Sequence, residues 1–267
     1  MSKIVLITGA SSGIGKSTAA FLASKNYTVY GTGRTPKSTA DDPYTLLPLD
    51  VTKIDSIEKV IQHIIAKEGR IDVLVNNAGM GITGPIEDTP TDEMRKVFET
   101  NFFGSIDMMK AVLPQMRKQQ SGTIINVTSI AGYMGLPYRG IYSATKGALD
   151  LVSEAIRMEV KEFGIQIATI APGDVATNIA AGRYHTPVFE NSAYKEKYQV
   201  NLDLMDSHVD SGMNPIKMAE QIYDIINLKH PNVHYKVGTF MEKFSIVLKK
   251  ILPSKQYEKL LMNHYKL

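Results

Sequence analysis

Cysteine is absent from the chain, which excludes disulfide bonds, thiolate metal ligands and catalysis by a thiol. Charge of one sign is also scarce. The formal net charge is +3, too small to indicate binding to nucleic acid or to a membrane. No apolar run approaches the length of a membrane span, and the residues before the first apolar run are too few for a signal peptide. We therefore expect a soluble cytoplasmic protein without a membrane span.

The composition supports one folded domain with a large core. The chain has 267 residues, of which 43% are hydrophobic and 21% are charged. It shows no internal repeat, no low-complexity tract and no clear domain linker. We therefore expect residues 1–267 to form a single domain.

Short apolar runs alternate with helical patterns along the first two thirds of the chain. Six runs are rich in β-branched residues, as strands buried on both faces of a parallel sheet are: KIVLITG, YTVYGTG, YTLLPLDVT, IDVLVNNAG, GTIINVTS and IQIATIAPG. Helical patterns between them cover about 15–25, 54–69, 91–119 and 142–163. This alternation predicts a Rossmann-like, doubly wound parallel sheet in a three-layer α/β/α domain.

Five of the predicted strands end in small or polar residues. The ends are Thr8-Gly9, Asp50, the stretch from Asn76 to Gly79, Thr128-Ser129 and Pro172-Gly173. Ligands of doubly wound sheets bind beyond the carboxyl ends of the strands. These five ends therefore predict one ligand crevice.

The turn GASSGIGKS after the first strand fits two kinds of nucleotide site. It ends in Gly-Lys-Ser like a P-loop, but a P-loop requires glycine where this chain has Ala10. Its glycines follow the pattern G-x-x-x-G-x-G, which also differs from the dinucleotide fingerprint G-x-G-x-x-G. A tight turn and a free helix N-terminus would still suit a pyrophosphate. The turn alone leaves both ligands open.

The segment YSATK places Tyr142 and Lys146 four residues apart near the start of a helix, on one helical face. Tyrosine has a reference pKa near 10, which makes it a poor acid–base group at neutral pH. A nearby ammonium favours the phenolate and lowers that pKa. The pair is either a catalytic acid–base unit or a solvent-exposed pair.

Several motifs, in order, resemble the short-chain dehydrogenase/reductase family in its compact single-domain form. They are TGASSGIG at 8–15, NNAG at 76–79, NFFG at 101–104, Ser129 after IINVT, YSATK at 142–146 and PGDVAT at 172–177. Together they cover the chain from residue 4 to about 177. The resemblance implies hydride transfer between a nicotinamide dinucleotide and a carbonyl or alcohol substrate, and it makes GASSGIGKS the dinucleotide turn.

The resemblance implies four catalytic residues. Tyr142 is the acid–base residue, and Lys146 lowers the pKa of Tyr142 and bonds the nicotinamide ribose. Ser129 donates a hydrogen bond to the reacting oxygen. Asn101 lies in the long helix and holds a water that connects Lys146 to solvent.

The cofactor-binding residues implied by the resemblance are spread over the strand ends. They are Gly9, Ser11, Ser12, Gly13, Ile14, Gly15, Arg34, Asp50, Val51, Asn77, Ala78, Gly79, Tyr142, Lys146, Pro172, Gly173, Val175 and Thr177. No metal is expected.

The end of the second strand favours NADP(H) over NAD(H). A carboxylate there would bind the ribose 2′-hydroxyl and repel a 2′-phosphate, but the family's acidic position falls on Gly33. Arg34 follows and can pair with a phosphate, with Ser11, Ser12 and Thr35 as further donors. Asp41 and Asp42 are the residues that could reverse this preference.

Residues 178–214 form a polar, loop-like region that we interpret as a substrate lid. Apolar and aromatic side chains there and nearby indicate an apolar carbonyl or alcohol, such as a steroid, retinoid or quinone, or they simply pack the lid. They are Met80, Ile82, Met134, Leu136, Tyr138, Tyr184 and Phe189, and His185 is a less favoured second acid.

The segment 240–267 is predicted to be helical and amphipathic on both sides of Pro253. Packing on the domain or on a partner subunit is favoured over a membrane-surface anchor. His230 and His234 are four residues apart, but Pro231 breaks the helical register, so we predict no metal site there.

Three classes of function follow. An NADP(H)-dependent carbonyl reductase or alcohol dehydrogenase is favoured, a non-catalytic nucleotide-sensing protein on the same fold is the alternative, and a P-loop phosphotransferase is disfavoured. The expected partners are a small carbonyl or alcohol substrate and further copies of the chain, as a homodimer or homotetramer, and not nucleic acid.

Overall fold

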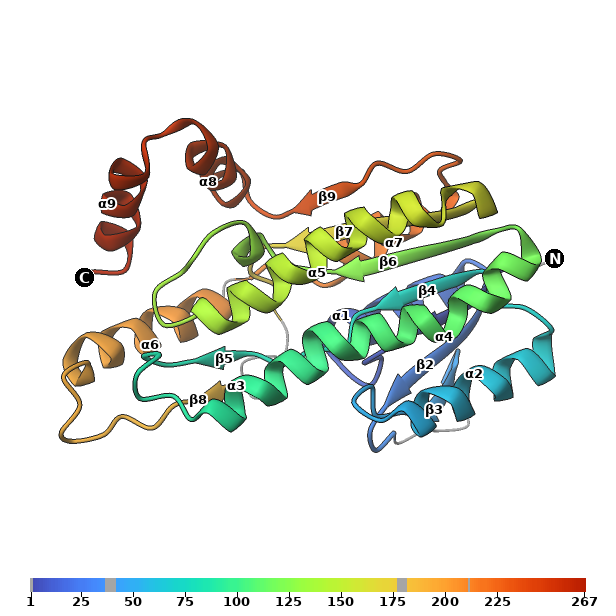
Figure 1. Ribbon diagram of the computed structural model, residues 1–267, viewed down its shortest axis with the longest axis horizontal. Coiled ribbons are helices and arrows are strands. Elements are labelled where there is room, and N and C mark those ends of the chain that lie inside the picture. Colours follow the sequence, from blue (N-terminus) through green and yellow to red (C-terminus); the bar gives the residue numbers. More distant parts are fainter. Residues whose placement is uncertain (1, 37–41, 177–181, 211) are drawn as a thin grey trace.

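A parallel seven-stranded sheet forms the centre of the computed structural model (Figure 1). The structure describes residues 2–36, 42–176, 182–210 and 212–267, except for the side chains of residues 204 and 206–210. The strand order is β3-β2-β1-β4-β6-β7-β9, and every pair in it is parallel. The strands are β1 (Ile4–Ile7), β2 (Thr28–Gly33), β3 (Thr45–Pro48), β4 (Val73–Asn76), β6 (Gly122–Val127), β7 (Ile165–Pro172) and β9 (His234–Val237). The predicted doubly wound sheet is confirmed.

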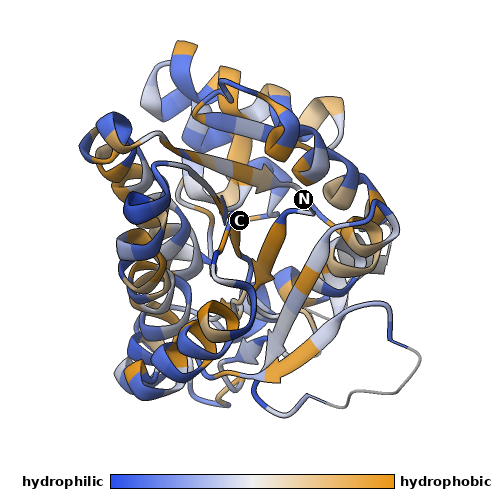
Figure 2. Ribbon diagram, turned by 90° about the vertical axis from the view of Figure 1, so that its right-hand side faces the viewer, coloured by the Kyte–Doolittle hydropathy of each residue, from blue (hydrophilic) through white to orange (hydrophobic). Residues whose placement is uncertain are grey.

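Helices cover both faces of the sheet and complete the three layers. The helices α1 (Gly13–Ser24) and α7 (Ile216–Asn227) pack on one face, and α2 (Ile54–Glu68), α4 (Gly104–Gln119) and α5 (Gly140–Glu159) pack on the other. Figure 2 shows strands with hydrophobic residues between helices in which hydrophilic and hydrophobic residues alternate. The buried sheet fixes the strand ends, and with them the crevice.

The apolar spacing of α2 shows how the sequence makes these helices. Ile57, Val60, Ile61 and Ile64 recur at helical spacing and are all buried against the sheet. The helix stops at Gly69, whose φ of +71° is a left-handed conformation that glycine adopts without strain.

The long helix expected at 91–119 is interrupted by a π-turn. It consists of α3 (Thr91–Phe98), the π-helix η1 (Glu99–Phe103) and α4. Asn101 lies inside the π-turn and is fully buried, which fits the tendency of such turns to occur at functional sites.

The described parts of the predicted loop-like region, 182–210 and 212–214, contain regular secondary structure. A short parallel pair joins β5 (Ile82–Thr83) to β8 (Tyr184–His185), and α6 covers Lys195–Asp210. Tyr198 of α6 is buried, and its hydroxyl donates a 3.0 Å hydrogen bond to the Thr83 carbonyl. The loop-like interpretation is therefore wrong for α6, which the buried Tyr198 anchors although most residues of the helix are polar.

The segment 240–267 forms two helices, α8 (Phe240–Ile251) and α9 (Ser254–His264). The side chains of Thr239 and Glu242 cap the start of α8 reciprocally, a capping box. Ile246 and Tyr257 anchor the two helices on the 3₁₀ helix η2 (Ile130–Tyr133). Across the described ranges, no helix is both long and apolar enough to cross a membrane.

Candidate active site

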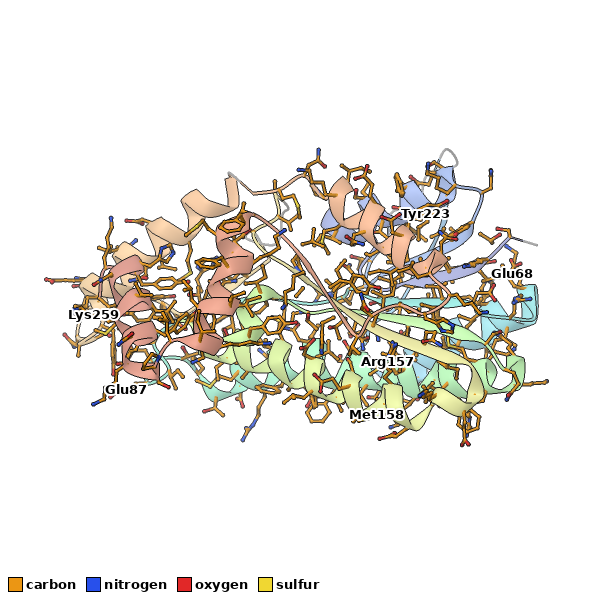
Figure 3. The ribbon with its side chains drawn as sticks, turned by 90° about the horizontal axis from the view of Figure 1, so that it is seen from above. Glu68, Glu87, Arg157, Met158, Tyr223 and Lys259 are labelled. Carbon is orange, nitrogen blue, oxygen red and sulfur yellow. The ribbon has the colours of Figure 1, made fainter. Side chains whose placement is uncertain are left out.

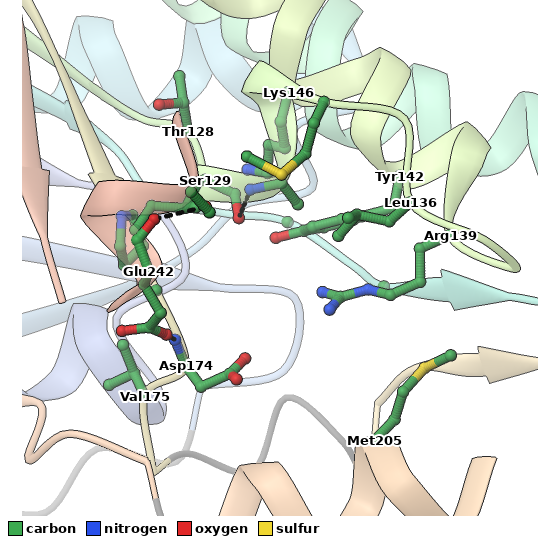
Figure 4. A pocket seen from close by; sticks show the side chains of 18 of the residues that line it. Thr128, Ser129, Leu136, Arg139, Tyr142, Lys146, Asp174, Val175, Met205 and Glu242 are labelled. Carbon is green, nitrogen blue, oxygen red and sulfur yellow. Dashed lines mark hydrogen bonds between the residues drawn. The ribbon is translucent and has the colours of Figure 1, made fainter. Parts of the chain in front are cut away.

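A cavity of about 480 Å³ lies beyond the carboxyl ends of β4, β6 and β7 (Figure 4). Its walls come from the sheet edge, from α5, and from the C-terminal helices α8 and α9. Of the residues predicted from the sequence, Ile14, Asn77, Gly79, Ser129, Tyr142, Lys146, Pro172, Gly173 and Val175 line it. Residues far apart in the sequence thus converge on one apolar space, as ligand sites of such sheets do.

The glycine turn after β1 leaves room for a ligand at the start of α1. Gly9 has a φ of +67°, and a Cβ on Gly15 would overlap the Gly9 carbonyl oxygen. Ser12 occupies the N-cap position, and its side chain makes no capping hydrogen bond to any described residue. The first-turn amides of α1 therefore remain for an anionic group.

Thr8 joins this turn to the end of β4, a role that the sequence did not reveal. Its hydroxyl oxygen accepts hydrogen bonds from the backbone amides of Asn77 (3.0 Å) and Ala78 (2.9 Å). The Asn77 side chain in turn donates to the carbonyls of Thr8 (2.9 Å) and Gly9 (3.1 Å). These four bonds fix the nucleotide turn against the strand beside it.

Tyr142 and Lys146 lie one turn apart on α5 and face the cavity. The Lys146 Nζ lies 6.0 Å from the centre of the Tyr142 ring and donates a 2.9 Å hydrogen bond to the Val127 carbonyl. Lys146 is 5% exposed, and this desolvation lowers its pKa, while the nearby Tyr142 acts to raise it. The pair is thus not an exposed surface pair.

Ser129 follows β6 and begins η2. Its hydroxyl oxygen accepts a 3.1 Å hydrogen bond from the Ala131 amide, which fixes the side chain at the cavity wall (Figure 4). The hydroxyl proton is free to point toward a ligand oxygen in the cavity.

Asn101 lies behind Lys146 and shapes the backbone next to it. Its Oδ1 accepts from the Met80 amide (2.8 Å), and its Nδ2 donates to the Met80 carbonyl (2.9 Å). A Cβ on Gly79 would lie 3.2 Å from the Asn101 Oδ1 and 3.6 Å from the Lys146 Nζ. The three residues therefore converge, although Asn101 itself does not line the cavity.

The predicted adenosine-side residues lie at the ends of β2 and β3, outside the cavity. Arg34 and Ser12 are exposed, and a Cβ on Gly33 would lie 3.1 Å from the Ser11 Oγ, so little space is available for a larger residue. Desolvation acts to raise the pKa of Asp50, but hydrogen bonds from Thr52 and the charges of Lys53 and Arg34 lower it overall. Val51 packs against Gly104, while Thr177 and Asp41 lie outside the described residues.

The far end of the cavity contains charged groups that the sequence did not predict. Figure 4 shows the Asp174 carboxylate and the Arg139 guanidinium pointing into the cavity from different sides. Glu242 of α8 accepts a 2.6 Å hydrogen bond from the Asp174 amide and also caps α8. The pattern T-x-x-E at 239–242 could have indicated this cap before the structure was known.

Only some of the predicted substrate residues line the cavity. Met80, Ile82, Met134 and Leu136 do. Tyr138 instead packs on the Tyr198 ring, with centroids 5.3 Å apart, and Tyr184 and His185 form β8. Phe189 is exposed.

Of the two histidines considered in the sequence, His234 contacts acidic side chains. His234 begins β9, and its ring contacts Glu154 at 2.9 Å and Asp150 at 3.3 Å on α5. Neither these three residues nor His230 lines the cavity. Among the described residues, this is the only grouping of three such side chains close enough to hold a metal, and it is partly exposed and hydrogen-bonded within itself.

Comparisons with known proteins agree with this geometry. The family model for short chain dehydrogenases matches residues 3–187. The chain is 40% identical over 252 residues to a 3-ketodihydrosphingosine reductase of Bacteroides thetaiotaomicron, covering 94% of this chain and 93% of that protein. A short-chain dehydrogenase structure from Streptomyces avermitilis is 32% identical, with a TM-score of 0.82 and 97% of each chain covered. The structure of ElxO with NADP bound is 29% identical, with a TM-score of 0.72 and 89% of this chain and 97% of that chain covered.

Proposed function

We propose that this chain, which belongs to the short-chain dehydrogenase family, uses NADP(H) to interconvert a carbonyl group and a secondary alcohol on a long apolar substrate. Membership of the family makes it an oxidoreductase that binds a pyridine nucleotide. One observation carries the finer proposal. Ser129, Tyr142 and Lys146 line the same apolar cavity, which opens between the nucleotide turn and the C-terminal helices.

The residues of the turn fit a dinucleotide. The missing side chains at Gly9 and Gly15 and the free first turn of α1 suit the pyrophosphate. Pro172, Gly173 and Val175, at the other end of the crevice, would border the nicotinamide. When bound, this coenzyme supplies or accepts the hydride.

The chain's own residues would handle the proton. The Tyr142 hydroxyl would protonate the carbonyl oxygen in reduction, or take the proton from the alcohol in oxidation. The Lys146 ammonium would favour the phenolate form of Tyr142, and Ser129 would donate a hydrogen bond to the reacting oxygen. Asn101 would order the backbone at Met80 and connect Lys146 to solvent through a water.

The preference for NADP(H) rests on the end of β2. Gly33 offers no carboxylate to repel a 2′-phosphate, and the exposed Arg34 offers a planar pair of donors to receive one. Ser11 packs next to Gly33 and adds a hydroxyl.

The substrate that we propose is a long-chain 2-amino-3-ketone like that of the 40%-identical reductase. The apolar wall of the cavity suits an alkyl chain, and Met134, Leu136 and Leu248 contribute to it. The Asp174 carboxylate points into the same space, and none of the hydrogen bonds or ion pairs found among the described residues engages it. It would pair with the ammonium group beside the ketone.

A nucleotide-sensing role without catalysis is not favoured, because the tyrosine, lysine and serine that such a protein would not need are all present at the cavity. A cytoplasmic location and a homodimer or homotetramer belong to the proposal as well. The exposed Leu151 and Met158 on α5 offer an apolar face for a second copy.

Oxidation of NADPH, followed by absorbance at 340 nm, tests the proposed function. We expect turnover with 3-ketodihydrosphingosine and slower turnover with an apolar ketone that lacks the amine. The Tyr142→Phe variant should turn over about 10²- to 10⁴-fold more slowly than the wild type. A higher kcat/KM for retinal or for a steroid ketone than for the amino ketone would overturn the proposed substrate. A Tyr142→Phe variant that turns over as fast as the wild type would overturn the proposed mechanism.

A further inference from the structure

The outer face of α8 carries an apolar stripe. Phe240, Phe244, Val247 and Ile251 recur at helical spacing, and all four are exposed, Phe240 to 72% and Ile251 to 67%. The rings of Phe240 and Phe244 stack with their centroids 5.5 Å apart. Four large apolar side chains on one exposed helical face indicate a contact surface rather than a solvated one.

Positive charge is concentrated on the same two helices. Residues 240–267 contain six lysines and two glutamates, a formal charge of +4 in a chain whose net charge is +3. Lys243 and Lys250 lie along one side of the stripe on α8, and Lys255 and Lys259 are exposed on α9. The rest of the chain is thus close to neutral, and the average charge conceals a basic end.

The stripe adjoins the mouth of the cavity. Met241 and Leu248 of α8 line the cavity one helical position away from the stripe, and Leu260 of α9 lines it while 47% exposed. An apolar surface therefore runs from the outside of α8 over the rim into the cavity.

We propose that α8 and α9 dock on the surface of an anionic lipid bilayer, with the Phe240–Phe244–Val247–Ile251 stripe at the headgroup–acyl boundary and the cavity mouth facing the lipid. An amphipathic helix with aromatic residues on one side and lysines beside them is suited to this interface. An apolar substrate could then pass from the bilayer into the cavity without entering water. Only this last consequence rests on the proposed function.

A second copy of the chain fits this surface less well. A two-fold contact through the stripe would bring the same residues of both copies together, so Lys243 and Lys250 would face like charges. Lipid phosphates supply the opposite charge. The exposed apolar face of α5 lies elsewhere on the molecule: Figure 3 shows Met158 away from Lys259 of α9.

Co-sedimentation of the full chain with vesicles tests the proposal without turnover, so its outcome is independent of the proposed function. The probes are phosphatidylcholine vesicles with and without phosphatidylglycerol, at low and high salt. We expect binding to the anionic vesicles that weakens with salt. Lys243→Gln/Lys250→Gln should weaken it about 25-fold, on the basis of about fivefold for each lysine near an anionic surface.

Matched variants separate this surface from general stickiness. Phe240→Ser/Phe244→Ser should abolish binding, whereas Lys217→Gln/Lys229→Gln and Ile54→Ser/Leu228→Ser, at exposed positions elsewhere, should bind as the wild type does. Coenzyme binding, followed by NADPH fluorescence, checks that each variant is folded. Wild-type protein that stays in solution with anionic vesicles would overturn the proposal. So would equal binding by the stripe variants, or a stripe variant whose only effect is a smaller oligomer by light scattering.

Discussion

The sheet edge and the C-terminal helices build the two sides of one cavity by different physical means. At the sheet edge, backbone geometry decides the residues: Gly15 has no room for a Cβ, and Thr8 and Asn77 bond directly to backbone groups. On α8 and α9, apolar packing determines which residues are tolerated, and many apolar side chains of similar volume would form an equivalent cavity wall. The comparison teaches that short motifs with fixed residues determine the proposed reaction, whereas the shape of a packed apolar surface determines which substrate fits.

The largest expected effect lies on the sheet-edge side. Tyr142→Phe removes the one hydroxyl placed to move the proton, so we expect kcat to fall by about 10²- to 10⁴-fold. Coenzyme affinity should stay within about threefold, because the ring that packs the wall remains. Single-turnover kinetics with bound NADPH measure the chemical step. If a conservative change on α8, such as Leu248→Met, lowered kcat more than Tyr142→Phe does, the reaction would depend more on the helical wall than on the sheet edge.

Arg34→Ala should give the next largest effect. A charge-assisted contact to the 2′-phosphate contributes about 1.5–3 kcal/mol, so kcat/KM for NADPH should fall about tenfold to a hundredfold. The value for NADH is the internal control and should not change. An NADPH preference that survives this substitution would move recognition of the phosphate to Ser11 or Ser12.

Asp174→Asn should have a smaller and more selective effect. The substitution keeps the shape of the side chain and its backbone bond to Glu242 but removes the charge proposed to pair with the substrate ammonium. We expect KM for the amino ketone to rise about tenfold, and KM for an apolar ketone of similar length to stay constant. Equal losses with both ketones would give Asp174 a purely structural role.

The accuracy of sequence interpretation differed between the same two regions. The strand runs and the Tyr142–Lys146 spacing could be predicted, because strand period and helical period alone place those residues. The π-turn around Asn101 could not, since it depends on bonds between Asn101 and the backbone of Met80, 21 residues away. The seventh strand of the sheet, β9, was also missed, because it is short and depends on pairing with β7.

The helical wall of the cavity could not be predicted from the sequence for a different reason. Helix α6 shows little apolar periodicity, and Tyr198 fixes it through a bond to Thr83 that no local pattern records. Glu242 and Asp174 are 68 residues apart and meet only in the folded chain. The averaged charge of the chain likewise gave no sign of a basic C-terminal end.

The smallest expected effect concerns stability at the sheet edge. Burial lowers the pKa of Lys146 from the usual 10.5, so the unfolded chain binds more protons than the folded one at pH values between the lowered pKa and 10.5. Stability contributed by this residue should therefore rise with pH through that window, by about 1.4 kcal/mol for each unit of depression. The Lys146→Met variant should lack this rise.

Chemical denaturation of both proteins from pH 7 to pH 9 measures the difference, because this range lies below the usual lysine pKa of 10.5 that applies to the unfolded chain. The exposed Lys229→Met variant is the control and should follow the wild type at every pH. We expect the free energy of unfolding of the wild type to rise with pH relative to that of Lys146→Met, because the buried ammonium is then deprotonated. A difference that stays constant over this range would contradict the prediction that burial of Lys146 costs stability at neutral pH.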